Sequence, residues 1–321
     1  MTRMALARGL GCALLVGFSA TLSGVLSGCG SSSPPSVTVS GGSDVFGLTP
    51  TAGTASIAGT LDQGGDQRSY IGIVPTAPAA GAPLLVMLHP LATNNVYMAN
   101  LTRVGRLVAS DGVIVVLPQG ENDTWHDDPA TNGPDDVGFI SALIGQISQQ
   151  YQTDPARVYV MGFSEGGFMT ERLVCDLSGT ITAAAAVSSL LRNSVAASCN
   201  PSRQISLAFI NGTADPINNF LGQPMIGTQS APASAAFWAQ KEGCNSTVPT
   251  VSLLPISVLD GTSITETTYP PCPQGIGVDF FTVNGGGHTW PGSQLPSQYG
   301  ITTQNMDATL RLWQFFQQPT Q

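Results

Sequence analysis

Short apolar runs alternate along the chain with segments of mixed polarity, and this alternation predicts most of the secondary structure. The apolar runs are five or six residues long, rich in Val, Ile, Leu and aromatic residues, and typical of buried strands. They cover residues 70–74, 84–88, 113–117, 157–161, 206–210 and 278–283.

The segments between these runs fit helices. In 136–151, apolar residues at positions 140, 143, 144 and 147 form one stripe, and Asp135 or Asp136 stands where an N-cap would. Residues 94–110, 168–177, 233–242 and 307–316 fit further helices. Strands buried on both faces and separated by helices predict an α/β fold, with a mostly parallel central sheet and helices on both faces.

The N-terminus has the features of an export signal. Arg3 and Arg8 precede an apolar stretch, 10–22, that is too short and too interrupted by Gly and Ser to span a bilayer, which predicts a signal peptide over residues 1–28. The sequence Leu26-Ser27-Gly28-Cys29 resembles the lipobox of bacterial lipoproteins, which implies a lipid anchor on Cys29. The alternative is an ordinary signal peptide and a secreted protein.

The remaining chain divides into a tether and one domain. Residues 29–44 comprise the lipidated cysteine and a polar segment rich in Pro and Ser, which would hold the protein off the membrane. Residues 45–321 show one composition without internal repeats, so we expect a single catalytic domain. The protein is thus expected in the cell envelope, outside the cytoplasm.

Four cysteines remain in the predicted domain after the signal peptide and Cys29 are set aside. An even number in an oxidising compartment predicts two disulfides. Three pairings are possible, and we favour Cys175–Cys199 and Cys244–Cys272 because each closes a local segment. No Cys-x-x-Cys spacing occurs and the three histidines lie far apart, so neither a metal nor a cofactor is expected.

Acidic residues outnumber basic ones by 20 to 11, which gives a net charge of −9. Such a chain repels phosphate backbones, so nucleic acid is excluded as an expected partner. Four neighbouring aspartates lack the ligand spacing of a calcium loop, and we expect them to form a solvated loop with a helix cap. They are Asp127, Asp128, Asp135 and Asp136.

One motif carries the chemistry. Gly162-Phe163-Ser164-Glu165-Gly166 follows the strand 157–161 and precedes a helix-compatible segment. In such a turn a strand reverses into a helix with the serine at the apex, and its glycines are required because the two backbones approach too closely for a Cβ. The motif alone occurs often by chance, but this context indicates a nucleophile at Ser164 instead of a plain turn serine.

A serine nucleophile needs an imidazole base and a carboxylate that orients it. His288 is the histidine downstream of Ser164, in a glycine-rich loop after the strand 278–283. Asp215 follows the strand 206–210, whereas Asp279 opens a strand and Asp176 belongs to the helix after the motif. We therefore expect Asp215 and His288 to complete a triad; the alternatives are an Asp-Pro turn and a surface-loop histidine.

The developing oxyanion needs backbone N–H donors. The residue after the nucleophile, Glu165, supplies one, and the loop after the strand 84–88 supplies the other. Pro90 in that loop has no N–H, so Leu91 is the expected second donor. His89, which ends the strand, is expected to support this loop.

With these residues placed, the chain resembles the polyhydroxybutyrate depolymerase and feruloyl esterase family of secreted bacterial esterases, in the α/β-hydrolase superfamily. The resemblance covers nearly the whole domain and rests on LLVMLHP, VIVVLPQG, the Trp125 loop leading to DDVGFISALI, RVYVMGFSEGG, INGTADP and GGGHTWPG. It implies that Ser164, Asp215 and His288 are the triad of a serine esterase, and it supports the two disulfides. The family usually has glycine where this chain has Pro90, which implies a reshaped oxyanion loop.

The expected substrate is an ester: a polyester such as polyhydroxybutyrate, or feruloyl or acetyl esters on plant polysaccharide. Trp125, His126 and Trp290 are candidates for a substrate wall, because aromatic faces beside a triad can hold an acyl group. Burial in the core is the alternative for each of the three. The rival hypothesis for the whole chain is a surface lipoprotein that uses a hydrolase scaffold for binding and performs no chemistry.

Overall fold

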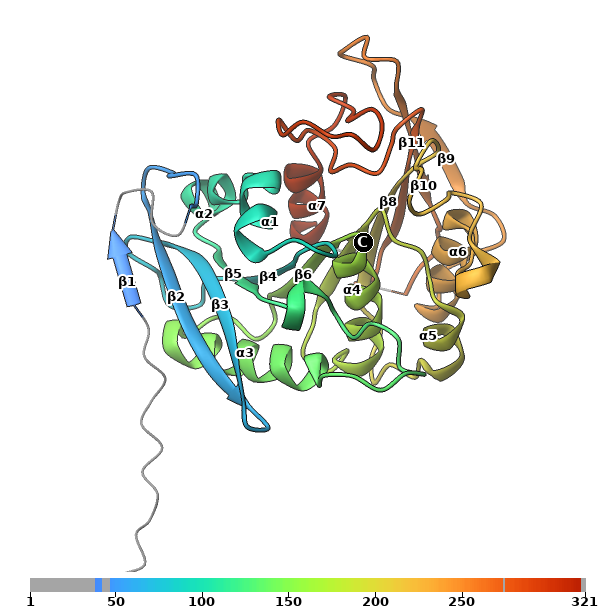
Figure 1. Cartoon of the computed structure of the whole chain (residues 1–321). Helices are drawn as coiled ribbons and strands as arrows, with labels where there is room; N and C mark the ends of the chain where they lie inside the picture. Colours follow the sequence, from blue (N-terminus) through green and yellow to red (C-terminus); the bar gives the residue numbers. More distant parts are fainter. Residues whose placement is uncertain (1–37, 42–46, 274, 319–321) are drawn as a thin grey trace, which may run out of the picture. The chain divides into compact units, whose positions relative to one another are not determined.

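A computed structural model of the chain describes residues 38–41, 47–273 and 275–318. The predicted signal peptide, Cys29 and most of the tether lie outside the described residues. Within them, eleven strands form one sheet in the order β1-β2-β3-β5-β4-β6-β7-β8-β11-β10-β9, with helices on both faces (Figure 1). No helix in this part of the chain is long and apolar enough to cross a membrane.

The centre of the sheet is parallel, as the buried apolar runs predicted. Its strands, in the part of the chain described, are β4 (Leu84–Leu88), β5 (Ile114–Pro118), β6 (Val158–Phe163), β7 (Ala183–Val187), β8 (Ser206–Gly212) and β11 (Val278–Asn284). Every residue of β4 to β8 is buried because helices cover both faces. The sequence did not predict β7, since four of its five residues are alanines, which have little strand preference.

Antiparallel strands extend the sheet at both edges. β1 (Thr38–Gly41), β2 (Thr54–Gln63) and β3 (Asp66–Pro75) lie beyond β5, and β10 (Ser263–Thr268) and β9 (Thr250–Leu253) lie beyond β11. Of these strands the sequence predicted the inner part of β3 alone. β2 and β10 mix polar and apolar residues because they are partly exposed, and β9 is exposed at every position.

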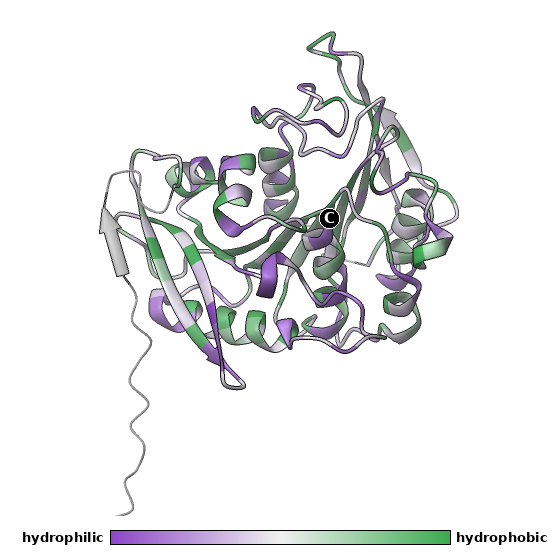
Figure 2. Ribbon diagram, viewed as in Figure 1, coloured by the Kyte–Doolittle hydropathy of each residue, from purple (hydrophilic) through white to green (hydrophobic). Residues whose placement is uncertain are grey.

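The helices divide between the two faces of the sheet (Figure 1). One face carries α1 (Asn95–Thr102), α2 (Gly105–Asp111) and α7 (Ala308–Gln317), and the other α3 (Asp136–Tyr151), α4 (Glu165–Asp176), α5 (Asn193–Ser198) and α6 (Ala231–Lys241). Successive side chains of β4 enter opposite cores, as strand geometry requires: Leu84, Val86 and Leu88 face one and Leu85 and Met87 the other. Figure 2 shows the hydrophobic residues gathered along the central strands. Short 3₁₀ turns are η1 (Glu121–Asp123) and η2 (Pro224–Ile226).

Two helix boundaries differ from expectation. The segment 94–110 forms two helices, because Arg103 adopts a left-handed conformation (φ 53°) that ends α1. α4 begins at Glu165, three residues earlier than predicted, since the turn at Ser164 leads directly into the helix. α3 has the predicted bounds, and the Asp135 side chain accepts a hydrogen bond from Gly138 N at 2.8 Å as its N-cap.

The expectation of a solvated acidic loop is wrong for two of its four members. Asp136 is buried in an ion pair with Arg68, and Asp127 is buried beside Arg192, whose Nε lies 2.6 Å from its carboxylate. Each aspartate is buried because a guanidinium from a distant segment neutralises it. Among the described residues, no group of three or more His, Cys, Asp or Glu side chains could hold a metal ion.

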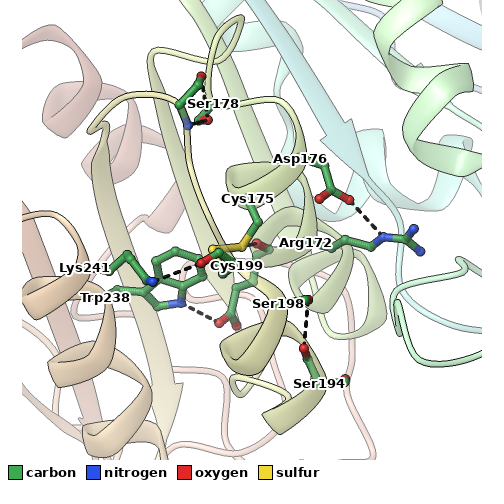
Figure 3. Close-up of a disulfide and its surroundings, with 11 residues drawn as sticks. Arg172, Cys175, Asp176, Ser178, Ser194, Ser198, Cys199, Trp238 and Lys241 are labelled. Atoms are coloured by element: carbon green, nitrogen blue, oxygen red, sulfur yellow. Dashed lines mark hydrogen bonds and ion pairs between the residues drawn. A yellow bond between two sulfur atoms is a disulfide. The ribbon is translucent and has the colours of Figure 1, made fainter.

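Both favoured disulfides are present, which confirms the pairing. Cys175 near the end of α4 is bonded to Cys199, which follows α5, and Cys244 after α6 is bonded to Cys272. Figure 3 shows the first bridge beside Trp238 and Lys241, whose Nζ donates to the Cys199 carbonyl oxygen at 3.0 Å. This bridge therefore ties α5 to α4, the helix that directly follows Ser164.

We expect the double substitution Cys175→Ala and Cys199→Ala to lower the free energy of unfolding by about 3 kcal/mol, because the bridge closes a loop with a sequence separation of 24 in the unfolded chain. Urea unfolding followed by circular dichroism measures the change. A loss below about 1 kcal/mol would contradict a cross-link of this loop length.

Candidate active site

Ser164 lies in a sharp turn between β6 and α4, with φ 56° and ψ −120°. A Cβ on Gly162 would lie 1.9 Å from the Gly166 carbonyl oxygen, and one on Gly166 would lie 2.3 Å from the Leu88 carbonyl oxygen. The turn therefore requires both glycines for the reason expected from the sequence. The Ser164 N–H donates to the Val187 carbonyl oxygen at 2.8 Å, which fixes the turn to β7.

The structure brings Ser164, Asp215 and His288 together, although Ser164 and His288 are 124 positions apart. His288 Nε2 lies 2.9 Å from Ser164 Oγ, and His288 Nδ1 lies 2.8 Å from Asp215 Oδ2. All three residues are buried, and they follow the carboxyl ends of β6, β8 and β11. This is the geometry of a nucleophile, its base and an orienting carboxylate.

Asp215 is held by its own turn. Its second carboxylate oxygen, Oδ1, accepts from the backbone N–H groups of Ile217 and Asn218, both at 2.8 Å. The Asn218 side chain in turn donates to the Ser188 carbonyl oxygen at 2.7 Å. Asp215 therefore fills both roles considered from the sequence: it stabilises the turn at Pro216, and it is hydrogen-bonded to His288.

The glycine-rich loop before His288 allows a second segment to approach. The His288 N–H donates to the Tyr299 carbonyl oxygen at 2.8 Å, and the Gly287 N–H donates to that of Ile301 at 3.0 Å. A Cβ on Gly287 would lie 2.2 Å from the Tyr299 oxygen. The backbone that carries the imidazole is thus bound directly to residues 299–301.

The loop after β4 is supported by His89, as the sequence indicated. Gly120 N–H donates to His89 Nε2 at 2.9 Å, so the proton of the neutral ring is on Nδ1, which donates to the Pro90 carbonyl oxygen at 2.9 Å. Thr93 Oγ1 donates to the same oxygen at 2.6 Å. Burial lowers the pKa of His89, which keeps the ring neutral.

Leu91 belongs to the loop after β4, and Glu165 directly follows Ser164 in the serine turn. Within the residues that the structure describes, neither backbone N–H donates a hydrogen bond, whereas the neighbouring Ala92 N–H is bonded to the Asp123 carbonyl oxygen at 2.9 Å. Leu91 also lines the cleft that contains Ser164. These two amides are thus free to receive a ligand oxygen.

A cleft of about 750 Å³ opens at Ser164 and His288. Among the described residues that line it, none is Asp, Glu, Lys or Arg. Its walls are mainly apolar or aromatic and include Leu91, Tyr97, Leu101, Ile217, Leu295 and Tyr299. Apart from Leu91, sequence reasoning missed these residues, because they come from helices and loops that carry no motif.

Neither Trp125 nor His126, both candidates for the substrate wall, lines the cleft. The Trp125 indole is buried against His89, with ring centroids 4.8 Å apart, and its Nε1 donates to the His89 carbonyl oxygen at 2.9 Å. The His126 ring is bonded to Thr131 and Pro134. Trp290 borders the cleft but is only 1% exposed, since it packs edge to face on Phe163 and donates to Thr309 Oγ1.

Two carboxyl groups on α4, that of the half-buried Glu165 and that of the buried Glu171, have raised pKa values. Glu165 accepts hydrogen bonds from Thr124 Oγ1 at 2.7 Å and Trp125 N at 3.1 Å, and burial raises its pKa to about 7. Glu171 accepts from Trp238 Nε1 at 2.8 Å and Ser189 Oγ at 3.2 Å, and burial also raises its pKa to about 7.

Residues 68–214 match the family model described as esterase PHB depolymerase. The putative esterase NocK of Nocardia uniformis subsp. tsuyamanensis is 29% identical over 273 residues, which are 77% of each chain. Feruloyl esterase B of Piromyces equi is 29% identical over 64% of this chain, and the bifunctional acetylxylan esterase/xylanase XynS20E of Neocallimastix patriciarum is 24% identical over 76%. The chain spans only 39% and 34% of the length of these last two proteins.

Among solved structures, an acetyl xylan esterase from Aspergillus awamori superimposes with a TM-score of 0.58 at 16% sequence identity. The match covers 72% of this chain and 94% of that one. The likeness confirms the predicted α/β-hydrolase fold.

The raised pKa of Glu171 predicts that its contribution to stability falls as pH rises. The folded chain retains the proton up to about pH 7, whereas the unfolded chain loses it near the ordinary value of 4.5. The contribution is therefore fully present below about pH 4.5 and is lost as pH rises to about 7. Glu171→Gln keeps an acceptor for Trp238 and cannot ionise.

We expect urea unfolding between pH 4.5 and 8 to show a smaller decline in stability for Glu171→Gln than for the unsubstituted protein. Comparing the two at each pH cancels the contribution of all other titrating groups. Parallel pH profiles would show that the carboxyl of Glu171 has the same pKa in the folded and unfolded chains.

Proposed function

Residues 68–214 match the esterase PHB depolymerase model, and from that similarity and the geometry of the site we propose that this protein is a serine carboxylic ester hydrolase that works through an acyl-enzyme. The observation that carries this proposal is the continuous pair of hydrogen bonds from Ser164 through His288 to Asp215 at the cleft. A scaffold used only for binding would have no need of this buried arrangement.

In the proposed reaction, Ser164 Oγ attacks the ester carbonyl carbon while His288 Nε2 takes its proton. Asp215 keeps the imidazole oriented and stabilises its positive charge, and the amides of Leu91 and Glu165 donate to the oxyanion. The tetrahedral intermediate collapses as His288 returns the proton to the leaving alcohol oxygen. Water, activated by His288, then attacks the acyl-enzyme and releases the carboxylic acid.

The cleft supports esters whose bound groups are uncharged. A carboxylate or ammonium group placed there would lose water without gaining an ionic partner from the lining residues described. Feruloyl esters, acetyl esters on polysaccharide and oligomers of hydroxybutyrate all meet this requirement. The names of the related esterases point to the first two classes, and the family name points to the third.

We further propose that the protein acts outside the cytoplasm, anchored through lipid on Cys29. The two disulfides support export, because such bonds form and persist in oxidising compartments. The lipobox-like sequence Leu26-Ser27-Gly28-Cys29 supports the anchor.

A fluorophosphonate probe tests the proposed nucleophile. We expect one covalent adduct on Ser164, identified by peptide mass spectrometry, and loss of both the adduct and the turnover of p-nitrophenyl butyrate in Ser164→Ala. Ser110→Ala, at an exposed position on α2, should retain both. Absence of an adduct and of turnover in the unsubstituted protein would favour the binding lipoprotein instead.

The uncharged cleft predicts discrimination between two acyl groups of similar length. We expect kcat/KM for p-nitrophenyl hemisuccinate to be at least about 10-fold lower than for p-nitrophenyl butyrate, because its carboxylate finds no cation. Ile217→Lys, at a half-exposed cleft position, should narrow the difference by supplying one. Equal kcat/KM values for the two esters in the unsubstituted protein would refute this account of specificity.

A further inference from the structure

The carboxyl of Glu165 is bonded to a segment of the chain that does not line the cleft. Glu165 is the first residue of α4, directly after Ser164. Its two oxygens accept from Thr124 Oγ1 and from the backbone N–H of Trp125, which belong to the loop after β5. The nucleophile turn and this loop are thus joined by two side-chain hydrogen bonds.

The loop after β5 also holds the loop that carries Leu91. Gly120 N donates to His89 Nε2, and Trp125 Nε1 donates to the His89 carbonyl oxygen, each at 2.9 Å. The Asp123 carbonyl oxygen accepts from Ala92 N at 2.9 Å. Residues 120–125 therefore make three hydrogen bonds to the loop of Leu91. Two hold His89, which precedes Leu91 in the chain, and one holds Ala92, which follows it.

Two of the residues 120–125 lie in a sparsely populated region of backbone conformation. Asn122 and Asp123 are consecutive residues in the left-handed region, with φ of 53° and 62°. Such conformations carry a free-energy cost and persist where surrounding contacts hold them. The bonds from Glu165 to Thr124 and Trp125 act immediately after this pair.

We propose that Glu165 is the positioning residue of the oxyanion hole. Its backbone N–H is one donor, and its side chain fixes residues 120–125, which hold the loop of the other donor at Leu91. The distance between the two donors is thus set by one residue. This inference rests on the proposed esterase function, because it assigns the geometry that stabilises the tetrahedral intermediate.

Glutamine can replace both hydrogen bonds of Glu165. Its amide oxygen accepts from Trp125 N, and its amide nitrogen donates to Thr124 Oγ1, whose hydroxyl can also accept. Alanine can replace neither. The positioning role therefore predicts that Glu165→Gln retains function and Glu165→Ala loses it.

Glu242 provides a matched control. Its carboxyl is buried, whereas that of Glu165 is half-buried, but burial raises the pKa of each to about 7, and Glu242 also accepts from a backbone N–H, that of Ile205, at 2.7 Å. Ile205 precedes β8, whereas Asp215 and the cleft lie at the opposite end of that strand. Glu242→Ala should lower stability and leave kcat unchanged.

The experiment compares these variants on p-nitrophenyl butyrate and with butylboronic acid, which forms a tetrahedral adduct on a serine nucleophile. For Glu165→Ala we expect kcat to fall about 10- to 100-fold with KM within about 2-fold, and the affinity for butylboronic acid to fall in parallel. Glu165→Gln should retain kcat within about 3-fold. If a folded Glu165→Ala variant has a lower affinity for butylboronic acid, the tetrahedral adduct has lost a hydrogen bond from a misplaced oxyanion donor.

Three outcomes would overturn the proposal: unchanged kcat and boronate affinity in Glu165→Ala, equal losses in Glu165→Ala and Glu165→Gln, or an equal loss of kcat in Glu242→Ala. If Glu165→Ala does not fold, Thr124→Val removes one of the two bonds and Trp125→Phe removes the donor to His89. Each should lower kcat by about 5-fold with KM unchanged, and unchanged kcat in both would also overturn it. Failure of the esterase function itself is distinct, since the unsubstituted protein would then show no turnover.

Discussion

The backbones of β6 and α4 approach so closely around Ser164 that no side chain fits between them, and the rest of the site depends on this contact. The space beside Gly162 is occupied by the Gly166 carbonyl group, and the space beside Gly166 by the Leu88 and His89 carbonyl groups. The same contact that forces the serine into its unusual conformation therefore also places the end of β4 against the first turn of α4. Nucleophile and oxyanion loop are neighbours for one steric reason.

Burial decided how much of the fold the sequence could predict. Central strands such as β4 and β5 are buried on both faces and read as unbroken apolar runs, so their position and their parallel arrangement could be predicted. β7 is equally buried, yet alanine lets its neighbours approach and carries no strand signal of its own. The antiparallel strands β2, β9 and β10 are exposed or partly exposed, and their mixed polarity resembles that of loops.

The proximity of Ser164, His288 and Asp215 could be predicted because each residue follows a strand and the three occur in the chain order expected of the proposed triad. The cleft walls could not, since Tyr97, Ile217 and Tyr299 are adjacent only after folding. The sequence left two positions open for Trp125, the substrate wall and the core, for a related reason: an aromatic residue near such a motif gives no indication of which way its ring faces. Its indole N–H is used for a backbone carbonyl group at the end of β4.

The helix that presents the nucleophile is fixed along its length by contacts of different kinds. Glu165 joins its first turn to Thr124, Glu171 joins its middle to Trp238, and Cys175 joins its last turn to Cys199. These contacts restrict the displacement of α4 and so keep the Ser164 side chain in the position that the reaction requires.

The pairing of residues 299–301 with the backbone of Gly287 and His288 has a consequence for how this site can evolve. The segment that supplies Tyr299 to the cleft wall also forms a backbone ladder with the base, so an insertion or deletion near it would displace the imidazole. Side chains such as Leu295 and Tyr299 are exposed and can be exchanged singly without altering that ladder. On this side of the cleft, substrate preference can therefore change through single substitutions. Insertions and deletions are tolerated only in other segments around the cleft, where they do not displace His288.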